Sequence, residues 1–406
     1  FWIRVMRVFL FVLILLLGAF SSTALKVPMK DVLKNISNWI LTTKVETNNI
    51  TNHKDTLSTS IFINGNLART LLASYKIFKD EDEKLASSYL SAGLGWCDTL
   101  CKLQHSASTH DNRPVAGWWD TGYSTLYIAD TGTAVTALAV CAELATSAAS
   151  RATYLDSMSR FAEFIVNGTN TTPQCSFSPN CTYDGGRNET AETWLVASGN
   201  PSDVNYGALG DGYYQGTINL LPYTISTATS GGAFFAEMWA TTGRQEFKDL
   251  SRASVDWLTR QIQDNGTIPY FINPPTLVEH TYQCISYSAE AFIDADIRNI
   301  ANPSLPRLKL TVEYLLQQQQ PNGELIGPGA SFGEQQRSPR AISLLQWYFR
   351  KTGDQRAKAA IDLYLRFLTS DDSRNYGLNQ YALVTGFVGL AVADLIKPWC
   401  TFVQAY

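Results

Sequence analysis

One pattern occurs twice in the sequence, as Trp239-Ala-Thr-Thr-Gly243-Arg-Gln-Glu-Phe247 and as Phe349-Arg-Lys-Thr-Gly353-Asp-Gln-Arg356. In both stretches a helical segment ends in Thr-Gly, and a second helical segment begins within a few residues. Glycine adopts the left-handed conformation that ends a helix at little cost, so the next helix can turn back antiparallel to the first. Both stretches therefore predict helical hairpins.

The helices that precede several other turns end in Asn-Gly, at Asn167-Gly168, Asn265-Gly266 and Asn322-Gly323. The intervals between these endings differ, which indicates a loose structural repeat and not a solenoid of fixed period. Apolar residues recur at helical spacing between the turns, whereas alternating strand patterns are scarce and short. We predict an all-α fold with eleven or twelve helices. They are expected at 28–44, 64–78, 83–103, 131–148, 151–166, 215–241, 245–263, 286–300, 304–319, 338–351, 354–369 and 379–397.

Composition excludes several classes of protein. The chain has 406 residues, of which 45% are hydrophobic and 17% charged, so it can bury a large core and is not a disordered chain. Its net charge is -4 and it has no basic block, which excludes a nucleic-acid partner. We found no dinucleotide fingerprint, no phosphate-binding loop and no histidine-rich metal motif, so we expect no cofactor and no metal.

The N-terminal residues have the pattern of a secretory signal peptide. Residues Met6 to Ala24 contain an arginine, an apolar run from Val8 to Leu17 and a small-residue ending. An uncleaved membrane anchor is the alternative, although the run is short for a span of about 20 residues. We predict a signal peptide at 1–24, in which residues 1–5 resemble translated upstream sequence. A single domain at 25–406 would then be secreted, extracellular and not attached to a membrane.

Glycosylation sequons agree with export. Seven asparagines begin Asn-X-Ser/Thr, and four of them lie between residues 167 and 190, which is typical of a secreted glycoprotein. The predicted glycosylation sites are Asn35, Asn49, Asn167, Asn170, Asn180, Asn188 and Asn265.

The chain contains seven cysteines, and in an oxidising compartment some of them should pair. Cys175 and Cys181 flank a short polar turn and are the predicted disulfide. Cys97 and Cys101 have a spacing found in metal sites, but no second cluster completes such a site. Cys141 lies among alanines and valine in a helical pattern and is interpreted as a small buried apolar residue.

Hairpins of this type, spread over a chain of this length, resemble the six-hairpin glycosidase superfamily. The resemblance implies an (α/α)6 toroid over nearly all of residues 25–406, with long loops and the functional site at one end. The stretch from Tyr381 to Ile396, which contains Gly386 and Gly389, is similar to the closing inner helix of such a toroid. Because unrelated activities share toroids, this resemblance does not choose a function.

Three acidic residues are the candidate catalytic groups. Asp120 follows two tryptophans, and an acid in an apolar wall has the raised pKa that a general acid needs. Asp211 lies between two glycines, and Glu290 lies one helical turn after Tyr287. Each has a plainer interpretation: Asp120 as the cap of a turn, Asp211 as a turn aspartate, and Glu290 as a solvated or salt-bridged side chain.

Aromatic faces suit the C–H faces of sugar rings, and an arginine can bind the carboxylate of a uronate. The predicted substrate-binding residues are Trp118, Trp119, Tyr214, Tyr287, Arg337 and Tyr381. For Trp118 and Trp119 a place in the core is the alternative, and for Arg337 a place on the surface.

We therefore expect a secreted glycoside hydrolase that acts on an extracellular or cell-wall polysaccharide. Asp120 would be the general acid, and Asp211 or Glu290 the general base. A uronate-polysaccharide lyase or epimerase is the second hypothesis, in which Tyr287, His280, Arg337 and Tyr381 act on the substrate. A non-catalytic extracellular glycoprotein that uses the toroid for binding or self-assembly is the third.

Overall fold

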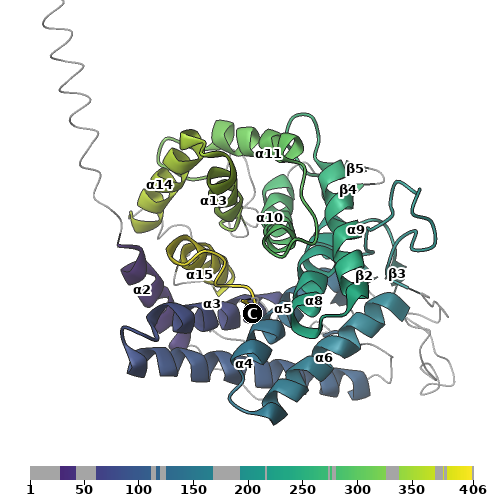
Figure 1. Ribbon diagram of the computed structural model, residues 1–406, viewed down its shortest axis with the longest axis horizontal. Helices are drawn as coiled ribbons and strands as arrows, with labels where there is room; N and C mark the ends of the chain where they lie inside the picture. The colour runs from purple at the N-terminus through teal and green to yellow at the C-terminus, as the bar shows by residue number, and fades with distance from the viewer. Residues whose placement is uncertain are drawn as a thin grey trace, which may run out of the picture.

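The computed structural model describes the chain in eleven segments. They are residues 28–42, 61–110, 116–118, 125–167, 193–214, 217–272, 275–276, 280–325, 338–370, 378 and 382–404. Within them, helices form two concentric rings, which Figure 1 shows from one end. The predicted signal peptide lies outside these segments.

The inner ring consists of six helical segments that contact one another in sequence order. They are α3 (Ile61–Phe78), α5 (Ile128–Leu144), the continuous α7 (Thr224–Ser226), η1 (Thr227–Phe234) and α8 (Phe235–Thr242), then α10 (Thr281–Ile297), α13 (Ala341–Thr352) and α15 (Ala382–Ile396). Helix α15 packs against α3, which closes the ring.

The outer ring alternates with the inner one along the chain. It comprises α2 (Met29–Leu41), α4 (Glu83–His110), α6 (Ala148–Asn167), α9 (Gln245–Gln261), α11 (Leu305–Gln318) and α14 (Gln355–Thr369). The connections that precede inner helices are long, for example 168–223, whereas those that follow them are short, for example 243–244. The predicted (α/α)6 toroid with long loops at one end is therefore confirmed.

Glycine ends the helices where the sequence predicts it. Gly243 and Gly353 cap α8 and α13 with φ angles of 70° and 73°. Gly266 and Gly323, in turns that follow outer helices, have φ angles of 86° and 102°. A residue with a Cβ atom is strained in this left-handed region, so the hairpin turns depend on glycine.

Small residues let the inner helices approach closely. A Cβ atom on Gly132 of α5 would lie 2.0 Å from the hydroxyl oxygen of Ser230 in η1. On α15, a Cβ atom on Gly389 would lie 2.4 Å from a methyl group of Thr70. The expected close packing of the glycine-containing C-terminal helix is thus present.

One predicted helix, 215–241, begins too early. Residues Gly212–Tyr214 form strand β2, which pairs antiparallel with β1 (Thr125–Tyr127) and with β3 (Thr217–Asn219). The helix begins only at Thr224, because the preceding residues are used in this three-stranded sheet. A second short pair, β4 (Phe271–Ile272) and β5 (Pro275–Thr276), precedes α10, which begins at Thr281 and not at residue 286.

The interpretation of Cys141 as an unpaired apolar residue is wrong. Cys141 of α5 forms a disulfide with Cys97 of α4, across a sequence separation of 44 residues. The bridge joins an inner helix to the outer helix packed on it. Cys101, one turn after Cys97, is a buried free thiol.

Candidate functional site

Asp211 lies at the end of the toroid where the inner helices begin. Its amide donates to the carbonyl of Asn219 at 3.0 Å, and its carbonyl accepts from the amide of Ile128, the first residue of α5, at 2.9 Å. A Cβ atom on the neighbouring Gly212 would lie 2.1 Å from the carbonyl oxygen of Leu126. The backbone around Asp211 is therefore fixed by pairing on both sides and by a position that tolerates no side chain.

The carboxyl group of Asp211 is buried and only weakly bound. The residue is 7% exposed, Oδ2 accepts from Nδ2 of Asn219 at 3.3 Å, and Oδ1 has no hydrogen-bond partner. Burial raises the pKa of Asp211 to about 6, against the opposing effect of the Asn219 hydrogen bond. Such a group keeps its proton to near neutral pH, which is what a general acid requires.

A group of aromatic rings begins near this carboxyl group, at Tyr223. The ring of Tyr223 stacks on Phe271 with 4.9 Å between centroids and meets Tyr270 edge-on at 4.9 Å. The Tyr270 ring lies 4.7 Å from that of His280, at the start of α10. Burial raises the pKa of Tyr223, and the charges of Tyr270 and Asp211 add to the effect, so Asp211 lies near Tyr223. We call Asp211, Tyr223, Tyr270 and His280 the Asp211 cluster.

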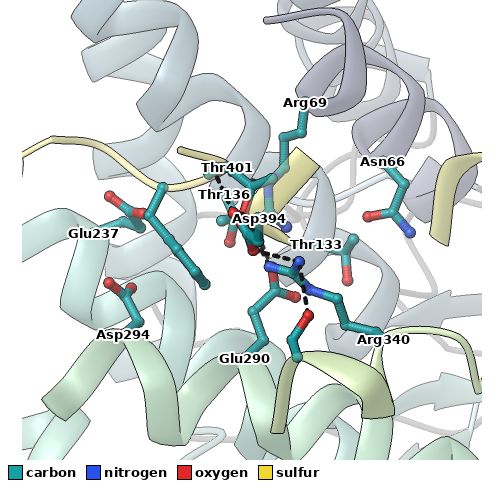
Figure 2. Close-up of polar contacts among 12 residues, drawn as sticks. Asn66, Arg69, Thr133, Thr136, Glu237, Glu290, Asp294, Arg340, Asp394 and Thr401 are labelled. Carbon is teal, nitrogen blue, oxygen red and sulfur yellow. Dashed lines mark hydrogen bonds and ion pairs between the residues drawn. The ribbon is translucent and has the colours of Figure 1, made fainter. Parts of the chain in front are cut away.

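Glu290 occupies the middle of the inner ring, where two arginines hold it (Figure 2). Its Oε1 pairs with Nη2 of Arg69 from α3 and, at 3.4 Å, with Nη2 of Arg340 at the start of α13. Burial tends to raise the pKa of Glu290, but the positive charges of Arg69 and Arg340 outweigh it and lower the pKa. Glu290 is therefore ionised at neutral pH.

A second carboxylate shares Arg340. Oδ2 of Asp394 in α15 accepts from Nη1 of Arg340 at 2.6 Å, and the hydroxyl of Thr401 accepts from Nη2 at 2.9 Å. A third pair lies beside this network, where Arg298 binds Asp294 at 2.6 Å and Glu237 at 2.9 Å. The guanidinium groups in this region of the described structure are thus all bound to carboxylates (Figure 2).

Two predicted sugar-binding residues belong to the core. Trp118 is 3% exposed, and its indole nitrogen donates to the carbonyl of Leu100 at 2.8 Å. Tyr287 is 4% exposed and packs edge-on against Phe387 at 5.5 Å. Both rings are packed against protein groups in the described structure, and their assignment as sugar platforms stays a prediction.

The other predicted residues lie outside the described part of the chain or are described only by their backbone. Asp120, Trp119, Arg337, Tyr381 and the predicted Cys175–Cys181 pair are outside it, as are Asn49, Asn170, Asn180 and Asn188. Tyr214 is placed in β2 and Asn167 at the end of α6 through their backbones alone.

Two sequons can be located. Asn35 is exposed on the outer helix α2, and Asn265 is exposed in the turn after α9. The amide oxygen of Asn265 accepts from the amide of Thr267 at 3.1 Å. Both positions are accessible, as a glycan requires, and their glycosylation stays a prediction.

Sequence reasoning missed most of the central network. Three members of this network, Arg69, Glu237 and Asp394, are each the charged residue in an apolar or small-residue stretch of a buried helix. This pattern in the sequence could have identified them as buried and paired charges. A charged residue in such a helix is rarely buried unless it is paired. The identity of each partner, which for Arg69 lies more than 200 residues away at Glu290, could not be read from the sequence.

Among the residues that the structure describes, no group of histidines, cysteines and acids could hold a metal ion. None of the described helices combines the length and the apolar character needed to cross a membrane.

Several solved structures resemble this chain in fold, although their sequences differ widely from it. The cellobiose 2-epimerase of Spirochaeta thermophila superposes with a TM-score of 0.54 at 12% identity, over 93% of this chain and 99% of that one. The family 76 glycoside hydrolase (mannosidase) of Bacteroides thetaiotaomicron superposes with a TM-score of 0.51 at 9% sequence identity, over 91% of this chain and 98% of that one. The chain has the six-hairpin glycosidase fold.

A second structure from Bacteroides thetaiotaomicron, a family 76 α-mannanase, agrees with a TM-score of 0.51 at 10% identity, over 91% of this chain and 96% of that one. No protein-family model matches the sequence, and no curated protein matches it. Identities near 10% establish the common six-hairpin fold and leave the activity to be argued from the site.

Proposed function

We propose that the protein is a secreted carbohydrate-active enzyme, a glycoside hydrolase in which Asp211 is the proton donor. The observation that carries the proposal is the buried carboxyl group of Asp211, which has one oxygen without a partner and lies near Tyr223 at the loop end of the toroid. Hydrolysis of a glycosidic bond needs an acid that is still protonated near neutral pH, and the raised pKa of Asp211 meets this need.

Glu290 is the proposed ionised partner. A hydrolase of this kind pairs a protonated acid with a carboxylate whose charge is retained, and the surroundings of Asp211 and Glu290 displace their pKa values in opposite directions. This assignment differs from the expectation from sequence, in which Asp120 donates the proton. Asp120 stays a candidate for a further carboxylate of the same site.

A neutral poly- or oligosaccharide is the proposed substrate. Recognition of a uronate needs a cation that is free to bind the substrate carboxylate. In the described interior, Arg69, Arg298 and Arg340 are each bound to carboxylates of the protein. This favours a neutral sugar over the uronate substrate of the lyase hypothesis.

Two observations support the proposed secretion. The Cys97–Cys141 disulfide is of the kind that forms in oxidising compartments, and accessible sequons at Asn35 and Asn265 suit a glycoprotein.

The test is hydrolysis of neutral cell-wall polysaccharides and oligosaccharides, measured by the release of reducing ends. Asp211→Asn should lower kcat by about 100-fold or more, since general acid catalysis contributes on that scale. Asp203→Asn is the matched control, because Asp203 lies in the same loop and only caps a turn, with Oδ1 accepting from the amide of Asn205 at 2.7 Å. Full activity in the Asp211 variant would overturn the assignment. A wild-type protein that binds glycans but changes none would favour the non-catalytic hypothesis.

An epimerase is the second candidate, favoured by His280. Its ring lies against Tyr270 in the Asp211 cluster, and a histidine can move a proton at a sugar carbon. Two of the structures with this fold are cellobiose 2-epimerases. Product analysis separates the candidates, because an epimerase changes the retention time of a disaccharide and leaves its mass unchanged.

A further inference from the structure

The chain that follows α15 runs into the middle of the toroid. Residues Cys400, Thr401 and Phe402 are fully buried, and Figure 1 shows the chain after α15 running toward the centre of the ring of helices. We call residues 400–404 the axial segment. Loops are normally found on the surface, because their polar backbone groups need partners there. A buried irregular segment therefore needs protein partners for its backbone.

Side chains from all six inner helical segments supply these partners. Carbonyl groups of the axial segment accept from Arg69 and Lys76 of α3 and from Arg298, which directly follows α10. Its amides donate to Glu143 of α5, Glu237 of α8 and Asp394 of α15, and Arg340 at the start of α13 binds the Thr401 hydroxyl. The bonds to the carbonyls are 3.3 Å long from Arg69, 3.0 Å from Lys76 and 2.9 Å from Arg298. Those from the amides are 3.3 Å long to Glu143, 3.1 Å to Glu237 and 3.2 Å to Asp394. The bond between Arg340 and the Thr401 hydroxyl is 2.9 Å long.

Two of these contacts lead directly to Glu290. Arg69 donates through Nε to the carbonyl of Thr401 and forms an ion pair through Nη2 with Glu290. Arg340 binds the Thr401 hydroxyl and Glu290 through the same nitrogen, Nη2. Each arginine therefore contacts both the axial segment and the carboxylate.

Phe402 contacts both arginines. Its ring centre lies 5.5 Å from the guanidinium carbon of Arg69 and 5.5 Å from that of Arg340. Two cations that converge on one carboxylate oxygen repel each other, and an aromatic face within about 6 Å offsets part of that cost. The ring also limits the rotation of two long and otherwise flexible side chains.

We propose that Phe402 is a positioning residue of the active site, which holds Arg69 and Arg340 in the geometry that fixes Glu290. The inference rests on the proposed function, in which Glu290 is the ionised carboxylate. Phe402 itself does not touch the substrate in this scheme. It acts through the two arginines, so its effect is on the chemical step and not on the affinity for sugar.

The test replaces the ring while keeping an apolar side chain of similar size. In Phe402→Leu, NMR of the arginine Nε–H groups should show increased motion for Arg69 and Arg340, whose signals are assigned by Arg69→Lys and Arg340→Lys. Phe161→Leu is the matched control, because Phe161 is also fully buried but has phenylalanine neighbours, Phe164 and Phe234. Unchanged arginine signals in Phe402→Leu, or equal changes in the control, would overturn the proposal.

Kinetics give the second readout. On a substrate identified as above, Phe402→Leu should lower kcat by about 10- to 100-fold with KM within about twofold, since misplacement of a catalytic group by about 1 Å has effects of this size. The control should keep its kcat. If wild-type protein hydrolyses no carbohydrate, the proposed function fails, whereas the arginine signals still decide whether Phe402 orders the two guanidinium groups.

Discussion

Replacement of Asp211 by asparagine should make the protein more stable at neutral pH while it removes activity. Asparagine has the same shape, keeps an oxygen that can accept from Asn219, and cannot ionise. In the wild type, burial raises the pKa of Asp211 from 3.8 to about 6. The folded state therefore holds the proton more tightly than the unfolded state, and loss of the proton opposes folding.

The size of the effect follows from this shift. A difference of about 2 pKa units corresponds to about 3 kcal/mol, because one unit is worth about 1.4 kcal/mol. The stabilisation from the protonated carboxyl group is fully present below about pH 4 and is lost as the pH rises to about 6. Asp211→Asn should therefore match the wild type near pH 4 and exceed its free energy of unfolding by about 3 kcal/mol at pH 7.

The assay is urea unfolding of both proteins at intervals from pH 4 to pH 8, followed by tryptophan fluorescence. All other ionisable groups are common to the two proteins, so their contributions cancel in the difference. A difference that is constant over this range, or that falls with pH, would refute the reasoning. A stabilising change that abolishes activity is the behaviour expected of a catalytic residue held in an unfavourable environment.

Three further predictions concern stability. Removal of the disulfide by Cys97→Ser and Cys141→Ser should cost about 4 kcal/mol, since the bridge closes a loop with a separation of 44 residues; a loss below about 1 kcal/mol in denaturant unfolding contradicts this. Glu290→Gln should lower the free energy of unfolding by about 3–5 kcal/mol, because it removes the carboxylate charge that the buried Arg69 and Arg340 share. Unchanged stability in the same assay would show that these ion pairs do not stabilise the fold. Gly132→Ala should lower the melting temperature, because its Cβ atom would lie 2.0 Å from a hydroxyl oxygen. Gly95 is the control, because it lies on an exposed face of α4 and a Cβ atom there would meet no atom within 4 Å. Gly95→Ala should raise the free energy of unfolding by up to about 1 kcal/mol. Equal effects of the two glycine variants would count against the close-packing argument.

The helices could be predicted because their signals are local. Gly243 and Gly353 end α8 and α13 through their own backbone conformation, and apolar spacing within each segment identifies the face that is buried. The exception, 215–241, arises where β2 pairs with β3 and also with β1, a strand about 90 residues earlier in the chain. Such pairing depends on a partner that no local pattern reveals.

The candidate site was predictable in part, for the same reason. Asp211 was identified from its neighbouring glycines and tyrosines, but its raised pKa comes from burial, which depends on the whole fold. Glu290 was expected on an inner helix, with a salt bridge as one alternative, but its partner Arg69 lies more than 200 residues away and could not be identified. The spacing of the cysteines likewise gave no indication that Cys97 pairs with Cys141.

The axial segment also has a consequence for how the chain folds. Its contacts join residues more than 300 positions apart, such as Arg69 and Thr401, and it follows all six hairpins in the order of synthesis. Until it leaves the ribosome, the charged side chains of the inner helices have no axial partner, and α15 has not yet closed the ring against α3. Contacts of such long range slow folding, and an open ring exposes apolar helix faces in the meantime. Nascent chains of this protein should therefore depend on chaperones until the axial segment has left the ribosome.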